Sequence, residues 1–179
     1  MDARDIINFW FDEIDSKAWW KKDPDFDALI RRRFLSVHEA AARGELYSWR
    51  EQPSGRLAEV IVLDQFSRNL YRDAPQAFAF DGMALVLSQE AVALGVDAAI
   101  PVAQRAFMYM PYMHSESPLI HEQAMSLFAE SGMENNYQFE LKHKAIIDRF
   151  GRYPHRNAIL GRESTTEELE FLQGPGSSF

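Results

Sequence analysis

The chain has 179 residues, 46% of them hydrophobic and 13% aromatic, so a single domain with a sizeable core is expected. Its formal net charge of −8 argues against non-specific nucleic-acid binding by the surface as a whole. The absence of cysteine excludes disulfides, thiolate nucleophiles and Cys-based zinc sites. We expect no signal peptide in the acid-flanked N-terminal segment, and no apolar run is long enough to span a membrane.

Start and stop signals predict seven or eight helices joined by short loops. Asp2 is placed to cap the first helix, and Asp23-Pro24 is the start signal of a long second helix that ends before Gly44. Asp81 is placed to cap the helix that runs to Leu94, and Ser164–Glu167 has the pattern of a capping box for the last helix. The predicted helices cover approximately residues 3–13, 24–43, 54–72, 81–94, 101–110, 118–130, 135–150 and 165–172.

No segment has the alternating pattern of a strand, and the β-branched run 60–63 has flanks of helical period. The predicted fold class is therefore all-α, a single domain of antiparallel helix pairs. Such pairs build both helical bundles and α-solenoids, although no sequence repeat of about 34 residues is visible. We expect the domain to cover residues 1–173 and to be followed by a Gly- and Ser-rich tail over 174–179.

One predicted helix changes character half way along its length. It is apolar almost all round up to Leu63, and then Asp64, Gln65, Arg68 and Arg72 fall within about 100° of arc. A polar stripe that continues an apolar one indicates a core face that lines a cavity. The alternative is that this end of the helix emerges into solvent, where Asp64 and Arg68 form an ordinary pair one turn apart.

A second segment, Arg105–Glu116, is apolar on every side before it reaches His114, and should therefore be central. Pro111 is expected to kink or end its helix just before His114, which leaves His114 and Glu116 in a loop. A metal site built from His114, Glu116 and His121 is geometrically possible, but neither an H-E-x-x-H motif nor the cysteines of a zinc deaminase are present. A histidine that ties down a loop is the simpler interpretation, and we expect no metal and no cofactor.

The strongest charge feature is a basic segment, residues 142–162, which contains six Lys and Arg residues and a single acidic residue, Asp148. Arginine suits bidentate capture of carboxylate or phosphate, and His155 can donate or accept a proton. The segment therefore predicts either a pocket for an anion or ion pairs with internal acids such as Asp64, Glu116 or Asp148. Aromatic residues for base stacking are few, so nucleic acid is not an expected partner.

Several stretches resemble segments of a known family, the bacterial domain-of-unknown-function family 924. They are Leu63–Arg72, Met110–Glu116, Arg149–Gly161, Ser164–Glu168 and Pro175–Phe179. The resemblance covers nearly the whole chain and implies a tetratricopeptide-like α-α superhelix, but it implies no reaction, because the family has no established activity. Ser67 stands where the family commonly has proline, and we expect the helix to be more regular for that reason.

These observations lead to three functional hypotheses. The first is a binding or scaffold domain that holds an acidic small ligand or peptide on a basic, polar concave side. Its candidate ligand-binding residues are Asp64, Arg68, Arg72, His114, Glu116, Arg152, His155 and Arg156. The second is a hydrolase-type enzyme in which His114 or His155 is the general acid or base beside Glu116. The third is an internal polar network without a ligand. All three assume a cytoplasmic protein without membrane or nucleic-acid partners.

Overall fold

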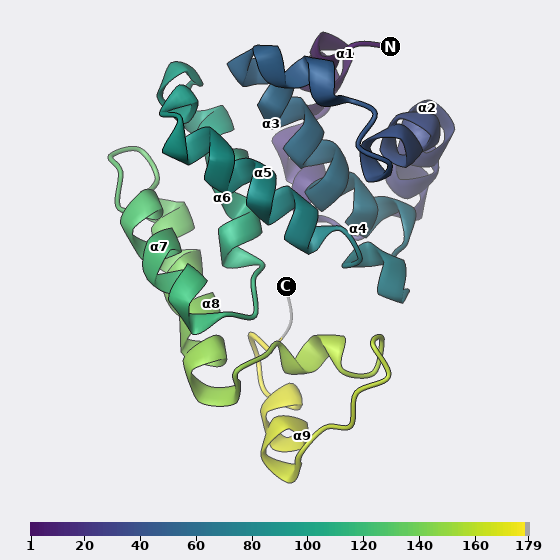
Figure 1. The fold of residues 1–179 in the computed structure, drawn as a ribbon. Coiled ribbons are helices and arrows are strands. Elements are labelled where there is room, and N and C mark those ends of the chain that lie inside the picture. The colour runs from purple at the N-terminus through teal and green to yellow at the C-terminus, as the bar shows by residue number, and fades with distance from the viewer. Residues whose placement is uncertain (178–179) are drawn as a thin grey trace.

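The computed structural model describes residues 1–177, and over this range the chain is helical without a strand (Figure 1). The α-helices are α1 Ala3–Asn8, α2 Pro24–Ala42, α3 Pro53–Ile61, α4 Ser67–Leu70, α5 Asp81–Ala93, α6 Val102–Met113, α7 Pro118–Phe128, α8 Glu134–Phe150 and α9 Thr166–Leu172. Short 3-10 turns and two π-helical segments, Phe9–Glu13 and Val62–Phe66, join or extend them. The predicted all-α class is confirmed, and the superhelical arrangement stays a prediction.

Helix starts that depend on local chemistry lie where the sequence predicted them. Asp2 caps α1, with its side chain accepting the N–H of Arg4. Asp23 caps α2 by accepting from Asp25 and Phe26. Gly44 follows α2 in the left-handed region at φ 71°, a conformation in which a Cβ would be strained.

The core includes an aromatic cluster that joins the two π-helical segments to α2 and α6. The ring of Phe9 is tilted against that of Phe34 with centroids 4.7 Å apart, and Trp10 meets Phe66 edge-on at 5.5 Å. Phe107 of α6 closes the cluster on the other side, 5.8 Å from Trp10. Tilted and edge-on arrangements such as these are favourable because the positive ring edge of one side chain meets the negative face of another.

The helix that carries the polar stripe is not regular. A π-helical segment, Val62–Phe66, widens it between α3 and α4, so the prediction that Ser67 leaves this helix more regular is wrong. The hydroxyl of Ser67 donates to the carbonyl of Leu63 at 2.6 Å, and such a back-bond to position i−4 competes with α-helical hydrogen bonding. The helix ends at Leu70, where Tyr71 leaves helical geometry at φ −126° and ψ 35°.

Three further helix boundaries differ from the predictions. Pro111 lies inside α6, which continues to Met113, because the packing of the buried residues Ala106–Met113 outweighs the cost of the missing donor. Asp81 is the first residue of α5 and does not cap it, since its carboxylate is engaged elsewhere. The capping box of α9 is formed by Thr165 and Glu168, one residue later than predicted.

The C-terminal part of the chain lies at the opposite end of the molecule from α1 (Figure 1). Helices α7 and α8 pack side by side, and Gly151 ends α8 in the left-handed region at φ 67°. The segment that follows holds a 3-10 turn, Pro154–Arg156, before α9. The tail was predicted over 174–179, and its last two residues lie outside the described part of the chain.

No helix within residues 1–177 combines the length and the apolar character needed to cross a membrane.

Candidate functional site

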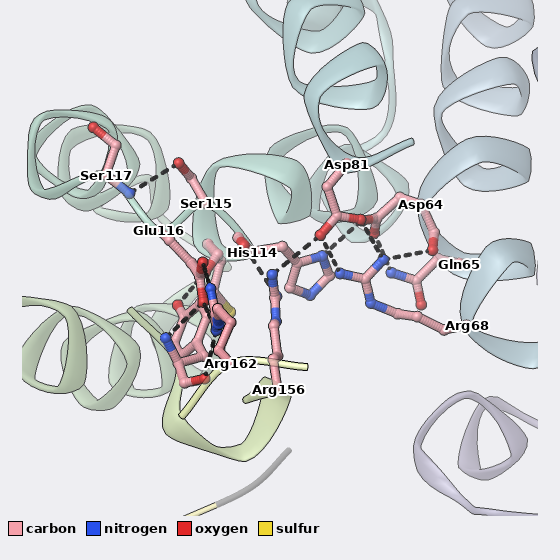
Figure 2. Close-up of polar contacts among 12 residues, drawn as sticks. Asp64, Gln65, Arg68, Asp81, His114, Ser115, Glu116, Ser117, Arg156 and Arg162 are labelled. Atoms are coloured by element: carbon pink, nitrogen blue, oxygen red, sulfur yellow. Dashed lines mark hydrogen bonds and ion pairs between the residues drawn. The ribbon is translucent and has the colours of Figure 1, made fainter. Parts of the chain in front are cut away.

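A cleft of about 310 Å³ opens between the start of α5, the end of α6 and the C-terminal segment. Its walls combine an apolar surface with a few charged side chains. The lining residues are Pro75, Phe78, Ala79, Asp81, Gly82, Leu85, Pro111, His114, Ser115, Glu116, Arg156 and Leu160. Segments far apart in the sequence therefore meet at His114 (Figure 2).

His114 has one ring nitrogen hydrogen-bonded to the protein and the other without a hydrogen bond within residues 1–177. Its Nδ1 lies 2.7 Å from Oδ1 of Asp64, whereas its Nε2 has no hydrogen bond within residues 1–177. The side chain is 17% exposed and lines the cleft. Burial and the nearby cation of Arg68 lower the pKa of His114 below its ordinary value, with Asp64 acting in the opposite direction. The imidazole is therefore neutral near pH 7.

Asp64 lies behind His114 in the π-helical segment, with a side chain that is 1% exposed. Burial by itself would raise the pKa of this carboxyl, but Arg68 and His114 outweigh it and hold the pKa well below its usual range. Gln65 donates to the second carboxylate oxygen at 2.6 Å, and Nη1 of Arg68 lies 3.0 Å from the first. Asp64 is thus a fixed anion that can only accept hydrogen bonds from His114.

Asp81 joins two arginines beside this pair. Arg68 binds it through the two terminal guanidinium nitrogens, Nη1 at 2.9 Å and Nη2 at 3.1 Å. Nη1 of Arg156 lies 3.3 Å from Asp81, and its Nη2 donates to the carbonyl of His114 at 3.0 Å (Figure 2). The guanidinium of Arg156 also lies between the rings of Phe78 and Tyr153, at 4.6 and 4.7 Å.

Glu116 fixes the C-terminal segment to the loop after α6. Its carboxylate accepts the backbone N–H of Tyr153 at 2.7 Å and two hydrogen bonds from Arg162, at 2.6 and 2.9 Å. Burial would raise the pKa of Glu116, but the hydrogen bonds from Arg162 and Tyr153 lower it overall. The bidentate geometry makes Glu116–Arg162 a directional link across the edge of the cleft.

The structure brings together five of the eight predicted site residues. They are Asp64, Arg68, His114, Glu116 and Arg156.

Arg72 and Arg152 are placed elsewhere. Arg72 binds Asp27 of α2 at 2.6 and 2.7 Å, because the helix has ended before it and the angular pattern no longer applies. Arg152 binds Glu168 of α9 at 2.6 and 2.8 Å. Neither arginine lines the cleft.

His155 is also absent from the cleft lining. Its ring lies 5.6 Å from that of Tyr153, and burial lowers its pKa to about 4. It is therefore a neutral packed side chain at physiological pH, which leaves His114 as the histidine that reaches the cleft.

The three residues considered as metal ligands do not form a cluster. His121 lies 2.6 Å from Glu140 through Nδ1 and donates from Nε2 to the carbonyl of Ser115. His114 and Glu116 are bonded to Asp64 and Arg162 instead. Across residues 1–177 no group of three or more His, Asp and Glu side chains is arranged to hold a metal ion. His121 is a buried histidine that ties down the 114–116 loop.

Sequence reasoning missed Asp81, Tyr153 and Arg162 as parts of the site. Asp81 had the pattern of a helix cap, and nothing local linked it to Arg156, 75 positions further along the chain. Arg162 was counted in the basic segment, where the match between its charge and that of Glu116 was the only signal. Tyr153 was considered only as one of the few aromatic residues of the basic segment.

The comparisons with known proteins agree with this fold. A family described as "Bacterial protein of unknown function (DUF924)" matches residues 6–176. The chain is also similar to a solved structure, that of the protein of unknown function ATU0120 from Agrobacterium tumefaciens. The two are 39% identical, with a TM-score of 0.91 over 96% of this chain and 97% of the other. No curated protein matches the chain. The chain therefore belongs to the DUF924 family of bacterial proteins of unknown function.

Proposed function

We propose that the cleft binds a small molecule and that neutral His114 meets it with the open nitrogen Nε2. One observation carries this proposal: Nδ1 lies 2.7 Å from Asp64, Nε2 has no hydrogen-bond partner within residues 1–177, and His114 lines the cleft. Because an ionised Asp64 can only accept, Nδ1 carries the proton and Nε2 carries the lone pair. A cleft that is partly apolar with a few convergent polar groups is typical of small-molecule sites.

The same geometry favours a hydrolase-type enzyme as a second candidate. A histidine oriented by a buried carboxylate is the usual form of a general base. In such a reaction Nε2 takes a proton from water, the water oxygen attacks the substrate carbonyl, and the imidazolium returns the proton to the leaving group. Arg156, which lies beside His114, is the cation nearest to the charge that develops on the carbonyl oxygen.

We assign a structural role to the predicted site residues outside the cleft. The support is that Arg72 and Arg152 each already bind a carboxylate with two nitrogens. The size of the cleft, about 310 Å³, favours a small molecule over a peptide. A tetratricopeptide-like scaffold and a cytoplasmic location fit the helical pairs and the absence of cysteine.

A thermal-shift screen of small polar and acidic metabolites tests the proposal, with binding confirmed by the ¹⁵N chemical shifts of the His114 ring. We expect hits to raise the melting temperature of the wild type and to move the Nε2 resonance. His114→Gln should lose those shifts. Arg72→Gln is the matched control, because it removes a predicted site residue outside the cleft and should keep the ligand response at a lower stability.

Identical ligand responses in the wild type and His114→Gln would refute the proposal. The hydrolase candidate makes a stricter demand, since Asp64→Asn would then have to lower turnover far more than it weakens binding.

A further inference from the structure

The charges around the cleft cancel. Each guanidinium is matched by a carboxylate within ion-pair distance, in the pairs Arg68–Asp64, Arg68–Asp81, Arg156–Asp81 and Arg162–Glu116. Three arginines and three acids therefore make a neutral site. Of the two alternatives that the sequence left open, these pairs agree with ion pairing to internal acids rather than with an unpaired basic pocket. A bare anion entering this cleft meets no cation that lacks a partner.

His114 is the group that can change this balance. The charged groups that face it are Asp64 from the π-helical segment, Arg68 from α4, Asp81 from α5 and Arg156 from the C-terminal segment. Two further titratable groups, His143 of α8 and His155 of the C-terminal segment, interact with it electrostatically. Asp64 and Asp81 favour its protonation, whereas burial and Arg68 oppose it. Once protonated, the ring would donate from Nδ1 to Asp64 and have a second N–H at Nε2 for a ligand, and the site would carry one net positive charge.

We propose that the cleft takes up a small monocarboxylic acid together with its proton, with Nε2 of His114 as the proton acceptor. This inference rests on the proposed function of the same site. In the step, the O–H bond of the acid breaks, its electron pair stays on the carboxylate, and the proton forms the N–H bond at Nε2. The resulting imidazolium lies between two carboxylates, that of Asp64 and that of the ligand.

The lining of the cleft indicates this ligand class over a phosphate. Proton transfer to His114 supplies one positive charge, which suits a monoanion and is too little for a phosphate dianion. The rest of the wall includes Phe78, Leu85 and Leu160, which would contact an apolar ligand body. Arg156 lines the cleft and has the longest of these ion pairs, at 3.3 Å, so we assign its guanidinium as the donor to the second carboxylate oxygen.

Proton uptake gives the binding a defined pH dependence. His114 is neutral in the free protein near pH 7, so each bound carboxylate must bring in about one proton from solution. At pH values above the pKa of His114 in the free protein, the apparent dissociation constant should therefore rise with pH, by up to tenfold for each pH unit.

Isothermal titration calorimetry with benzoate and its neutral isostere benzamide tests the inference. Titrations at about pH 6, 7 and 8, each in two buffers of different ionisation enthalpy, count the protons taken up. We expect about one proton for benzoate and none for benzamide. His114→Gln should abolish the proton uptake, and Arg72→Gln should leave it intact.

The outcomes separate this inference from the function on which it rests. If benzamide binds and benzoate binds without proton uptake, the cleft is a ligand site but the proton-coupled inference is wrong. If benzoate, benzamide, acetate and phenylacetate all fail to bind at millimolar concentration, both are wrong. Proton uptake that persists in His114→Gln would move the acceptor to another residue and also overturn the inference.

Discussion

The two ends of the molecule are stabilised by different kinds of interaction. We call residues 1–133 the body and residues 134–177 the C-terminal region. The body contains one continuous cluster of buried apolar side chains that runs from Ile6 to Met133. Among the described residues, the C-terminal region has a separate cluster of only three, Ile146, Ile147 and Tyr153. Besides the packing of α8 on α7, it is held by ion pairs, and two of these, Arg156–Asp81 and Arg162–Glu116, join it to the body beside the cleft.

This difference explains why the cleft lies where it does. Apolar burial is strong but non-directional, so it gives the body stability without fixing individual polar atoms. Bidentate ion pairs are weaker in water but directional, so they fix the position of the C-terminal region against the body. His114 stands at the boundary, with its ring bonded to Asp64 of the body and its carbonyl bonded to Arg156 of the C-terminal region.

The largest effect is expected from Phe34→Ala in the body. Phe34 is fully buried, with ring centroids 4.7 Å from Phe9 and 5.1 Å from Phe66, and its removal leaves a cavity. We expect a loss of about 3–5 kcal/mol in the free energy of unfolding. Urea unfolding followed by tryptophan fluorescence measures it, because all four tryptophans lie in the first 50 residues.

Phe139→Ala is the matched control for that variant. Phe139 belongs to the C-terminal region and is 44% exposed, so a loss below about 0.5 kcal/mol is expected. Similar losses for the two phenylalanines would contradict the proposed contrast between the regions.

Acidification should loosen the C-terminal region before the body. Burial lowers the pKa of His143 to about 3 and that of His155 to about 4. Unfolded histidine titrates near 6.5, so the unfolded chain binds these protons first and stability falls as the pH drops below that value, by roughly 2 kcal/mol per histidine near pH 5. Arg152 lowers the pKa of Glu168 to about 2, so its contribution is present above about 4.5 and is lost as the pH falls from there toward 2.

Two groups reduce the difference in acid sensitivity between the body and the C-terminal region. His38 in the body also has a pKa lowered by burial, to about 4, so the body shares part of the acid sensitivity. Glu140 acts in the opposite sense, because burial raises its pKa and its protonation favours the folded state.

Hydrogen exchange at about pH 5 should show faster exchange after residue 150 than in α3. Uniform loss of protection in both regions would argue against separate behaviour.

The smallest of the three effects is the coupling between Glu116 and Arg162. The two side chains are 26% and 25% exposed, so solvent screening limits the pair to about 1 kcal/mol in a double-mutant cycle of alanine variants. The surface pair Arg43–Glu45, whose side chains are 59% and 54% exposed, is the control and should couple by less than about 0.5 kcal/mol. Equal coupling in the two pairs would mean that Glu116–Arg162 is only a surface contact.

The sequence predicted the features that depend on neighbours along the chain. The caps at Asp2 and Asp23 and the stop at Gly44 follow from local chemistry, and each is found where it was expected. The continuation of α6 through Pro111 was missed, because packing against other helices decides it. The π-helical segment that ends just before Ser67 was missed as well.

The candidate site was predicted only in part for a similar reason. The pairing of Asp64 with Arg68 lies within one helix and could be foreseen from its spacing. The basic segment looked like an unbalanced charge because the acids that neutralise Arg156 and Arg162 are Asp81 and Glu116, which lie 75 and 46 positions away. Periodicity carries no information about pairs at such separations.

The π-helical segment has a further consequence for the cleft. A π turn accommodates one residue more than an α turn, so the helical phase after Val62–Phe66 is offset from the phase before it. Side chains of α3 are therefore in register with the core, while Asp64 and Arg68 follow a second register that points them at His114 and Asp81. Residues 53–70 are thus one continuous helical segment with two sets of side-chain directions, one toward the core and one toward the cleft. The π-helical turn sets the angle between these two sets.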